Sequence, residues 1–181
     1  ERGNIWNTVV KNCLNCPIEA TPAGLDALYK YEETASLPLL KGDNYNDLEK
    51  KYNGKTFKLP KNKLGWKSIK FNFSDNCFAL DVIDAENKKS TISMGYDEWI
   101  ESQLAGYPHY SIGAQNRFSG ITGPFYTGAC YAWQNDNSLQ AKVHYTNWVT
   151  SILLTFDFSG KTPELTVSEY SHKKSHPYLS C

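Results

Sequence analysis

The sequence has no surplus of charge of either sign. Its 181 residues include 19 Lys and Arg and 19 Asp and Glu, so the formal net charge is zero. A protein that holds nucleic acid through its phosphates needs a basic surplus, and we therefore expect no nucleic-acid partner. The sequence also lacks an apolar run of about 18 residues, the length that spans a bilayer. We expect no transmembrane segment.

Patterns typical of disulfide frameworks and metal sites are also missing. Cys13 and Cys16 form a C-x-x-C pair, but a zinc ribbon needs a second pair, and a thioredoxin-like site needs a preceding strand. Whether the two are bridged stays open, and an enzyme acting through them is the weakest of three functional hypotheses. The four histidines form no pair with credible metal geometry, so we expect no metal and no cofactor. The cysteines, odd in number and widely spaced, are Cys13, Cys16, Cys77, Cys130 and Cys181.

What the sequence does contain is a strong alternation of apolar and polar residues. The stretch from Phe125 to Ser168 holds three such runs, separated by short polar breaks. Successive side chains of a strand point to opposite faces of a sheet, so the runs predict an antiparallel meander of half-buried strands. The polar positions of the second run include His144, which we expect at the surface. The residues expected on the buried faces are Phe125, Ala129, Tyr131, Trp133, Leu139, Ala141, Val143, Tyr145, Trp148, Ile152, Leu154, Phe156 and Phe158.

Similar alternation precedes the meander. It predicts strands over 55–59, 66–73, 78–82 and 91–94, then a helical turn or irregular edge over 96–104, and one further strand over 110–114. Connections this short require antiparallel neighbours. About eight or nine such strands in sequence either form a sandwich or close on themselves. We expect an up-and-down antiparallel β-barrel, because closure leaves no exposed edge.

The chain before the strands is helical in pattern. Apolar residues at helical spacing predict a helix over 5–14, and Thr21 followed by Pro22 predicts the start of a second helix that reaches about Ala35. Residues 41–46 have the composition of a polar connector. We therefore divide the chain into a helical lead-in (1–51), a barrel (52–172) and a polar tail (173–181).

Several short sequences resemble one bacterial domain. They are NGKTF at 53–57, NKLGWKSIKFNF at 62–73, GYDEW at 95–99, YAW at 131–133, DNSL at 136–139 and LTFDF at 154–158. The domain follows the catalytic module in some serine hydrolases of the β-lactamase family. The resemblance covers the chain from about Ile5 to Ser171. It implies a lipocalin-like barrel, tethered by the helix that contains Leu25 and Leu28, and a periplasmic or secreted protein.

Catalytic motifs of that hydrolase family occur only in the wrong order. The family needs Ser-x-x-Lys, then a Ser-Asp-Asn-like element, then Lys-Thr-Gly. Here Ser171 and Lys174 match the first, 74–76 match the second and 161–163 half-match the third, so the nucleophile would come last. The motif at 74–76 also lies in a predicted turn, where such residues are common. We interpret all three as chance matches, predict no catalytic residue, and expect the nucleophile of a parent enzyme upstream of Glu1.

Aromatic residues are the remaining candidates for a site. Trp99, Trp133, Tyr145 and Trp148 could line the mouth of a barrel and bind a small apolar or glycan ligand. They could instead fill the interior of a small barrel, and packing is the favoured interpretation. The leading functional hypothesis is a non-catalytic accessory domain that packs on or gates the catalytic module of the same polypeptide, or mediates assembly. The alternative is a free-standing ligand-binding barrel.

Overall fold

The computed structural model describes residues 21–34, 37–62, 64–105, 123–147, 151–169 and 175–179. The chain divides into two compact units, Glu1–Pro38 and Leu39–Cys181. The helices within the described ranges lack the length and apolar character that crossing a membrane requires. The division of the chain at 51/52 and 172/173 stays a prediction.

In the first unit the structure describes one helix, α2 (Pro22–Thr34). Its start follows the predicted chemistry: Thr21 Oγ1 accepts a hydrogen bond from the Gly24 backbone N–H at 3.2 Å, as an N-cap does, and Pro22 takes the first helical position. Every residue of α2 is exposed. The second predicted helix is therefore confirmed, and the one predicted over 5–14 lies outside the described residues.

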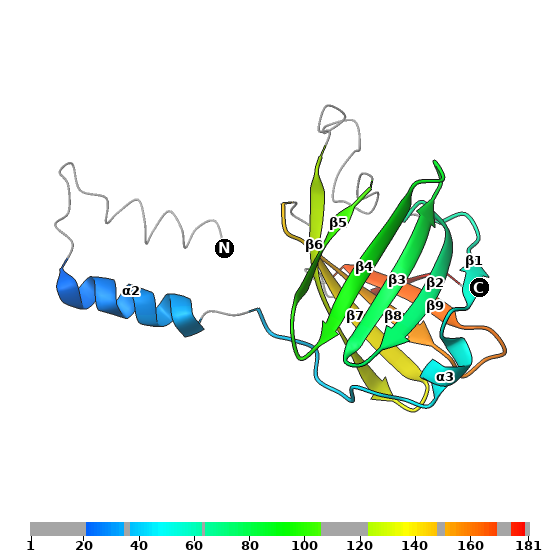
Figure 1. The fold of residues 1–181 in the computed structure, drawn as a ribbon, viewed down its shortest axis with the longest axis horizontal. Coiled ribbons are helices and arrows are strands. Elements are labelled where there is room, and N and C mark those ends of the chain that lie inside the picture. The colour runs from blue at the N-terminus through cyan, green and yellow to red at the C-terminus, as the bar shows by residue number, and fades with distance from the viewer. Residues whose placement is uncertain are drawn as a thin grey trace. The chain divides into compact units, whose positions relative to one another are not determined.

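The second unit is one curled sheet (Figure 1). Its strands pair in the order β1-β2-β3-β4-β6-β7-β8-β9-β10, and β5 pairs with β6 off this path. The predicted antiparallel succession is confirmed from β1 to β4 and from β6 to β9. β10 adds to β9 inside the segment expected as a polar tail. The bounds are β1 Thr56–Lys58, β2 Trp66–Ser74, β3 Cys77–Asp84, β4 Lys89–Tyr96, β5 Ile100–Leu104, β6 Phe125–Asn135, β7 Ser138–Tyr145, β8 Ser151–Asp157, β9 Glu164–Glu169 and β10 Ser175–Leu179.

The prediction of a closed up-and-down barrel is wrong. The sheet is a half-barrel with β1 and β10 at its two ends, and β4 pairs with β6 in parallel, through Gly95↔Cys130 and Tyr96↔Tyr131. The reason lies in β5, which occupies the first half of β6 from Leu104↔Phe125 to Ile100↔Ala129. The same edge of β6 therefore pairs first with β5 and then, further along the strand, with β4.

The segment 96–104, expected to be a helical turn or irregular edge, contains the strand β5. The chain leaves β4 through Asp97, whose φ is 57°, and turns back on itself. Gly95 makes this return possible, because a Cβ there would lie 2.3 Å from Glu98 Cγ. Ser102 Oγ then accepts a hydrogen bond from the Ser93 N–H at 2.9 Å, so a side chain links β5 to β4.

The inner face of the curled sheet is packed with the apolar residues that the alternation predicted. Aromatic rings meet across the interior: Phe71 on β2 lies 5.2 Å from Phe156 on β8, and Phe78 on β3 lies 5.9 Å from Tyr131 on β6. Burial of each such ring contributes about 1.5–3 kcal/mol. Lys142 is also buried, but it lies over Trp99 and outside this core. The largest fully buried apolar side chains are Trp133, Tyr131, Phe71, Phe78, Phe156, Ile69, Leu80, Ile92, Met94, Leu139 and Ile152.

Residues 41–54, which we call the strap, precede β1 within the second unit and contain a one-turn helix, α3 (Leu48–Tyr52). The strap pairs with the far end of β6: the Asp43 N–H donates to Trp133 O at 2.8 Å, and the Trp133 N–H donates to Asp43 O at 2.9 Å. Gly42 lies so close that a Cβ would approach Trp133 O to 2.1 Å. Tyr52 then packs on Phe158, 4.8 Å between ring centres. The polar connector expected over 41–46 is therefore part of the fold of the sheet.

Candidate functional site

The aromatic residues predicted to contact a ligand do not gather at one place. Trp133 and Tyr145 belong to the buried core on the inner face of the sheet. Trp133 is 1% exposed and packs on Phe158, and burial raises the pKa of the Tyr145 hydroxyl well above its usual range. Trp99 is half-buried beside His144. Trp148 lies outside the described residues. Their role in ligand binding stays a prediction.

Trp99 belongs to a cluster with Lys142, His144 and Ser151. The Trp99 ring centre lies 5.0 Å from that of His144 and 5.5 Å from Lys142 Nζ, and His144 Nδ1 shares a hydrogen bond with Ser151 Oγ. His144 is half-buried, although the alternation predicted it at the surface. Burial, and then the charge of Lys142, lower the pKa of the His144 ring. The alternation of β7 places Lys142 and His144 on the face opposite Ala141 and Val143, which belong to the buried core.

The Ser-Asp-Asn sequence lies in the β2–β3 turn, as predicted. Asn76 adopts a φ of 53°, and Ser74 Oγ donates to Cys77 O at 3.4 Å. Asn76 Oδ1 accepts a hydrogen bond from Asn44 Nδ2 of the strap at 3.1 Å. The geometry of the turn therefore explains why Ser, Asp and Asn occur at positions 74–76. Ser171 and Lys174 lie outside the described residues.

The β2–β3 turn and the strap border an open hollow of about 610 Å³, which we call the end cleft. Its size falls within the range of about 300–1,000 Å³ that is typical of ligand pockets. Most of the residues in its lining carry polar side chains. The lining residues are Asn44, Tyr45, Glu49, Lys50, Asn53, Phe73, Ser74, Asp75 and Asn76.

Glu49 is the buried acid of the end cleft. Glu49 is 9% exposed, and its Oε1 accepts a hydrogen bond of 2.7 Å from the Trp133 indole N–H. Burial raises the pKa of the Glu49 carboxyl, and the hydrogen bond from Trp133 opposes that rise. The single turn of α3 places Glu49 and Tyr52 on one side of the helix, and both are buried. Trp133, predicted as a ligand or packing residue, thus fixes an acid that contributes to the cleft.

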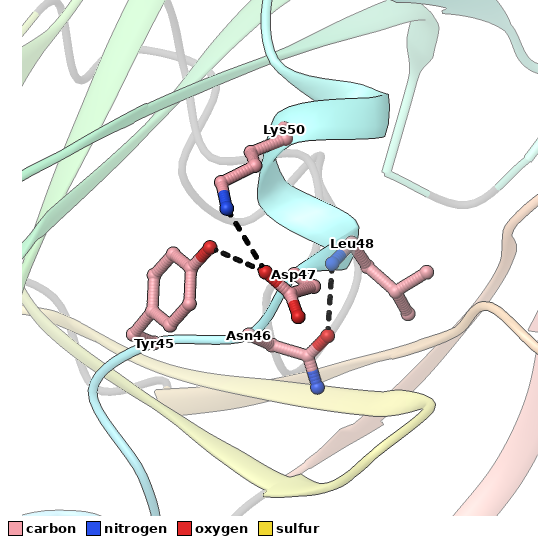
Figure 2. Close-up of polar contacts among 5 residues, drawn as sticks. All are labelled: Tyr45, Asn46, Asp47, Leu48 and Lys50. Atoms are coloured by element: carbon pink, nitrogen blue, oxygen red, sulfur yellow. Dashed lines mark hydrogen bonds and ion pairs between the residues drawn. The ribbon is translucent and has the colours of Figure 1, made fainter.

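Asp47 organises the rim of the end cleft (Figure 2). Its Oδ1 accepts hydrogen bonds from Tyr45 OH at 2.7 Å and Lys50 Nζ at 3.1 Å. The hydrogen bond from Tyr45, and then the interactions with Lys50, hold the pKa of the Asp47 carboxyl below its usual range. Lys50 Nζ also lies 5.6 Å from the centre of the Tyr45 ring. The rim therefore holds the exposed Tyr45 ring in a defined position.

Amide side chains form much of the remaining wall. Asn53 Oδ1 accepts a hydrogen bond from the Phe73 backbone N–H at 2.9 Å, which ties the end of the strap to β2. Asn44 and Asn76 are joined by the hydrogen bond described above. Each amide uses one polar end to hold the fold, and the opposite end can hydrogen-bond a ligand. The arrangement suits recognition of hydroxyl groups rather than covalent chemistry.

Sequence patterns contain little sign of the end cleft. Residues 47–52 form one helical turn, which is too short for a helical period to be recognised. Glu49 and Trp133 are 84 residues apart, so their contact depends on the path of the strap. The one available signal was Asn46 and Asp47 before Leu48, residues typical of helix starts.

Side chains of the described residues form no group of three or more His, Cys, Asp and Glu that could hold a metal ion. No family model matches the chain, and no curated protein matches it.

Proposed function

We propose that this chain is a non-catalytic accessory domain of a bacterial serine hydrolase of the β-lactamase family, in the periplasm or secreted. Its sheet packs on or gates the catalytic module of the same polypeptide, or mediates assembly. The resemblance of the strand and turn sequences is the reason for naming this hydrolase family. The packed interior of the sheet supports a domain that works through its outer surface.

The observation that carries the proposal is the apolar stripe of α2. Leu25, Leu28 and Tyr29 lie on one side of the helix and are 40%, 49% and 57% exposed. A helix of 13 residues is marginally stable by itself in water, so it needs a partner that covers its apolar side. The segment that contains Leu25 and Leu28 is also the one that resembles the tether to the hydrolase module.

The first experiment measures hydrolysis by this chain of ester, β-lactam and D-aminopeptide substrates. We expect no turnover. Turnover that is lost in a Ser171→Ala variant would overturn the proposal. The coding sequence immediately upstream of Glu1 gives a second check, because we expect a Ser-x-x-Lys module there, and an upstream sequence of another class would contradict us.

The second experiment addresses α2 in the full-length protein. Leu25→Asp with Leu28→Asp should detach the catalytic module, because it places charges on the apolar stripe, and limited proteolysis between the modules should become faster. Ala27→Asp is the matched control, since it adds the same side chain on the opposite side of the helix. Equal proteolysis rates for both variants would contradict a role for this stripe.

A further inference from the structure

We propose that the end cleft binds a neutral carbohydrate, with Glu49 and the neighbouring amides recognising its hydroxyl groups. This inference goes beyond the accessory role and does not depend on it. It also assigns the ligand site to a part of the fold other than the one the aromatic residues suggested. The cleft, the fixed acid inside it and the exposed ring at its rim are the three observations that carry it.

The charge of the end cleft selects against anions. Glu49 and Asp75 contribute carboxylates, and Lys50, the only cation among the described residues that line the cleft, is paired with Asp47 at 3.1 Å. A phosphate or carboxylate ligand would therefore meet a net negative site with its basic group already engaged. Hydroxyl groups avoid this repulsion, because they donate hydrogen bonds to carboxylates and amide oxygens and accept them from amide N–H groups.

The polar groups are held in place before any ligand arrives. The Trp133 indole N–H fixes Glu49 Oε1, and the Phe73 N–H fixes Asn53 Oδ1. A carboxylate has about four sites that accept hydrogen bonds, so Glu49 keeps acceptor capacity after its contacts with the Trp133 indole and the Asn46 backbone. Asn53 likewise keeps its NH₂ group as a donor. A site ordered in this way loses less conformational entropy when it binds a ligand.

The Tyr45 ring supplies the apolar part of the site. Tyr45 is 47% exposed and lines the end cleft, and Asp47 and Lys50 hold its hydroxyl and its face. The C–H face of a pyranose is apolar and packs on an aromatic ring, while its hydroxyl groups point outward to polar partners. An exposed ring beside amides and a carboxylate matches both sides of such a sugar.

The test is a titration of the full chain with chitotriose, cellotriose and maltotriose, followed by two-dimensional ¹H–¹⁵N NMR. The Trp133 indole N–H is the reporter, because it donates directly to Glu49. We expect one of these neutral sugars to shift that signal in a saturable manner at millimolar concentration. The anionic trisaccharide 3′-sialyllactose should shift it much less. The Trp133 signal is assigned from its displacement in the Glu49→Gln variant.

Glu49→Gln keeps an oxygen for Trp133 but removes the charge, and we expect the apparent Kd for the sugar to rise about tenfold. Tyr45→Ala should raise it several-fold through loss of the stacking surface. Glu101→Gln, the same change at an exposed position on β5, should leave it unaltered. A dispersed spectrum shows that each variant is folded, and Tyr45→Ala serves alone if Glu49→Gln does not fold.

Three results would overturn the inference. The first is the absence of any shift of the Trp133 signal with all three neutral sugars. The second is a shift that Glu49→Gln and Tyr45→Ala leave at wild-type affinity, which would place the sugar elsewhere. The third is binding of 3′-sialyllactose as tight as that of the neutral sugars, because the acidic lining should oppose it.

Discussion

At the scale of single residues, the contact between Glu49 and Trp133 joins the fold to the candidate site. The indole N–H donates to a carboxylate that is nearly buried, so water cannot readily take the place of either hydrogen-bond partner. Trp133 also contributes the largest side chain of the packed interior. The Trp133 ring therefore packs in the core, and its indole N–H orients the Glu49 carboxylate.

We expect Trp133→Phe to lower the free energy of unfolding by about 2–4 kcal/mol, because it leaves a cavity and a buried carboxylate without its donor. Urea denaturation measures the change. Glu49→Met in the Trp133→Phe background removes the orphaned acid and should recover part of the loss. A double variant less stable than Trp133→Phe alone would show that the carboxylate is adequately solvated without the indole.

The pKa of Glu49 predicts a pH dependence. Burial raises this pKa above its ordinary value of 4.5, so the folded state binds the proton more tightly than the unfolded state does. The resulting stabilisation is fully present below pH 4.5 and is lost as the pH rises through the raised pKa. The unfolding free energy of the wild type should therefore fall relative to that of Glu49→Gln over this range. Parallel curves from denaturation at a series of pH values would contradict a raised pKa.

Individual residues also show what the sequence could reveal. The buried faces of β6, β7 and β8 were predicted correctly, for example at Tyr131, Val143 and Phe156, because a period of two depends only on local geometry. The burial of Glu49 could not be predicted, because a single buried acid next to exposed lysines produces no periodic pattern in the sequence. Its burial depends on the strap, which crosses from one part of the sheet to another.

At the scale of elements, sequence patterns misjudged the strap and β5, as they did β10. Residues 41–46 are polar because they run along the surface, yet Asp43 pairs with Trp133 as a strand would. Residues 96–104 begin with a bend at Asp97, which obscured the alternation of the short strand after it. Both segments pair with β6, and pairing partners far apart in sequence leave no local signal.

Gly42 is the point at which the strap meets β6, and we expect Gly42→Ala to lower the unfolding free energy by about 1–3 kcal/mol. The new Cβ would collide with the carbonyl oxygen of Trp133, which is backbone and cannot rotate away. Gly160→Ala is the control, since its Cβ would meet ordinary contact at 3.4 Å, and a change within about 0.5 kcal/mol is expected there. Equal effects of the two substitutions in urea denaturation would rule out the close approach.

At the scale of the whole molecule, the buried core lies within a single unit. Every buried residue among the described ranges, from Glu49 to Val167, belongs to Leu39–Cys181, and α2 in the other unit buries none. The mainly antiparallel sheet was predicted from the sequence, because short connections between strands allow little else. Whether the sheet closes into a barrel could not be predicted, because closure depends on which strand pairs with each part of the edge of β6.

A chain restricted to Leu39–Cys181 should therefore unfold with the same midpoint in urea as the full chain, to within about 0.5 kcal/mol in free energy. The measurement follows Trp fluorescence, and circular dichroism checks that the shorter chain retains its sheet. A loss of more than about 2 kcal/mol would show that the lead-in supports the core, since a change that large requires the loss of a specific buried contact.

One edge of β6 is completed by three segments in turn: β5 along its first half, β4 at Cys130 and Tyr131, and the strap at Trp133. Each has to close a loop of different length before the strand is fully paired, and the longest brings Asp43 to Trp133. Loop closure of this kind slows the approach to the native state, because chain entropy is lost before contacts compensate for it. The refolding rate in stopped-flow experiments should therefore be set by docking onto β6, and Gly42→Ala should slow refolding only if the strap docks before the rate-limiting step.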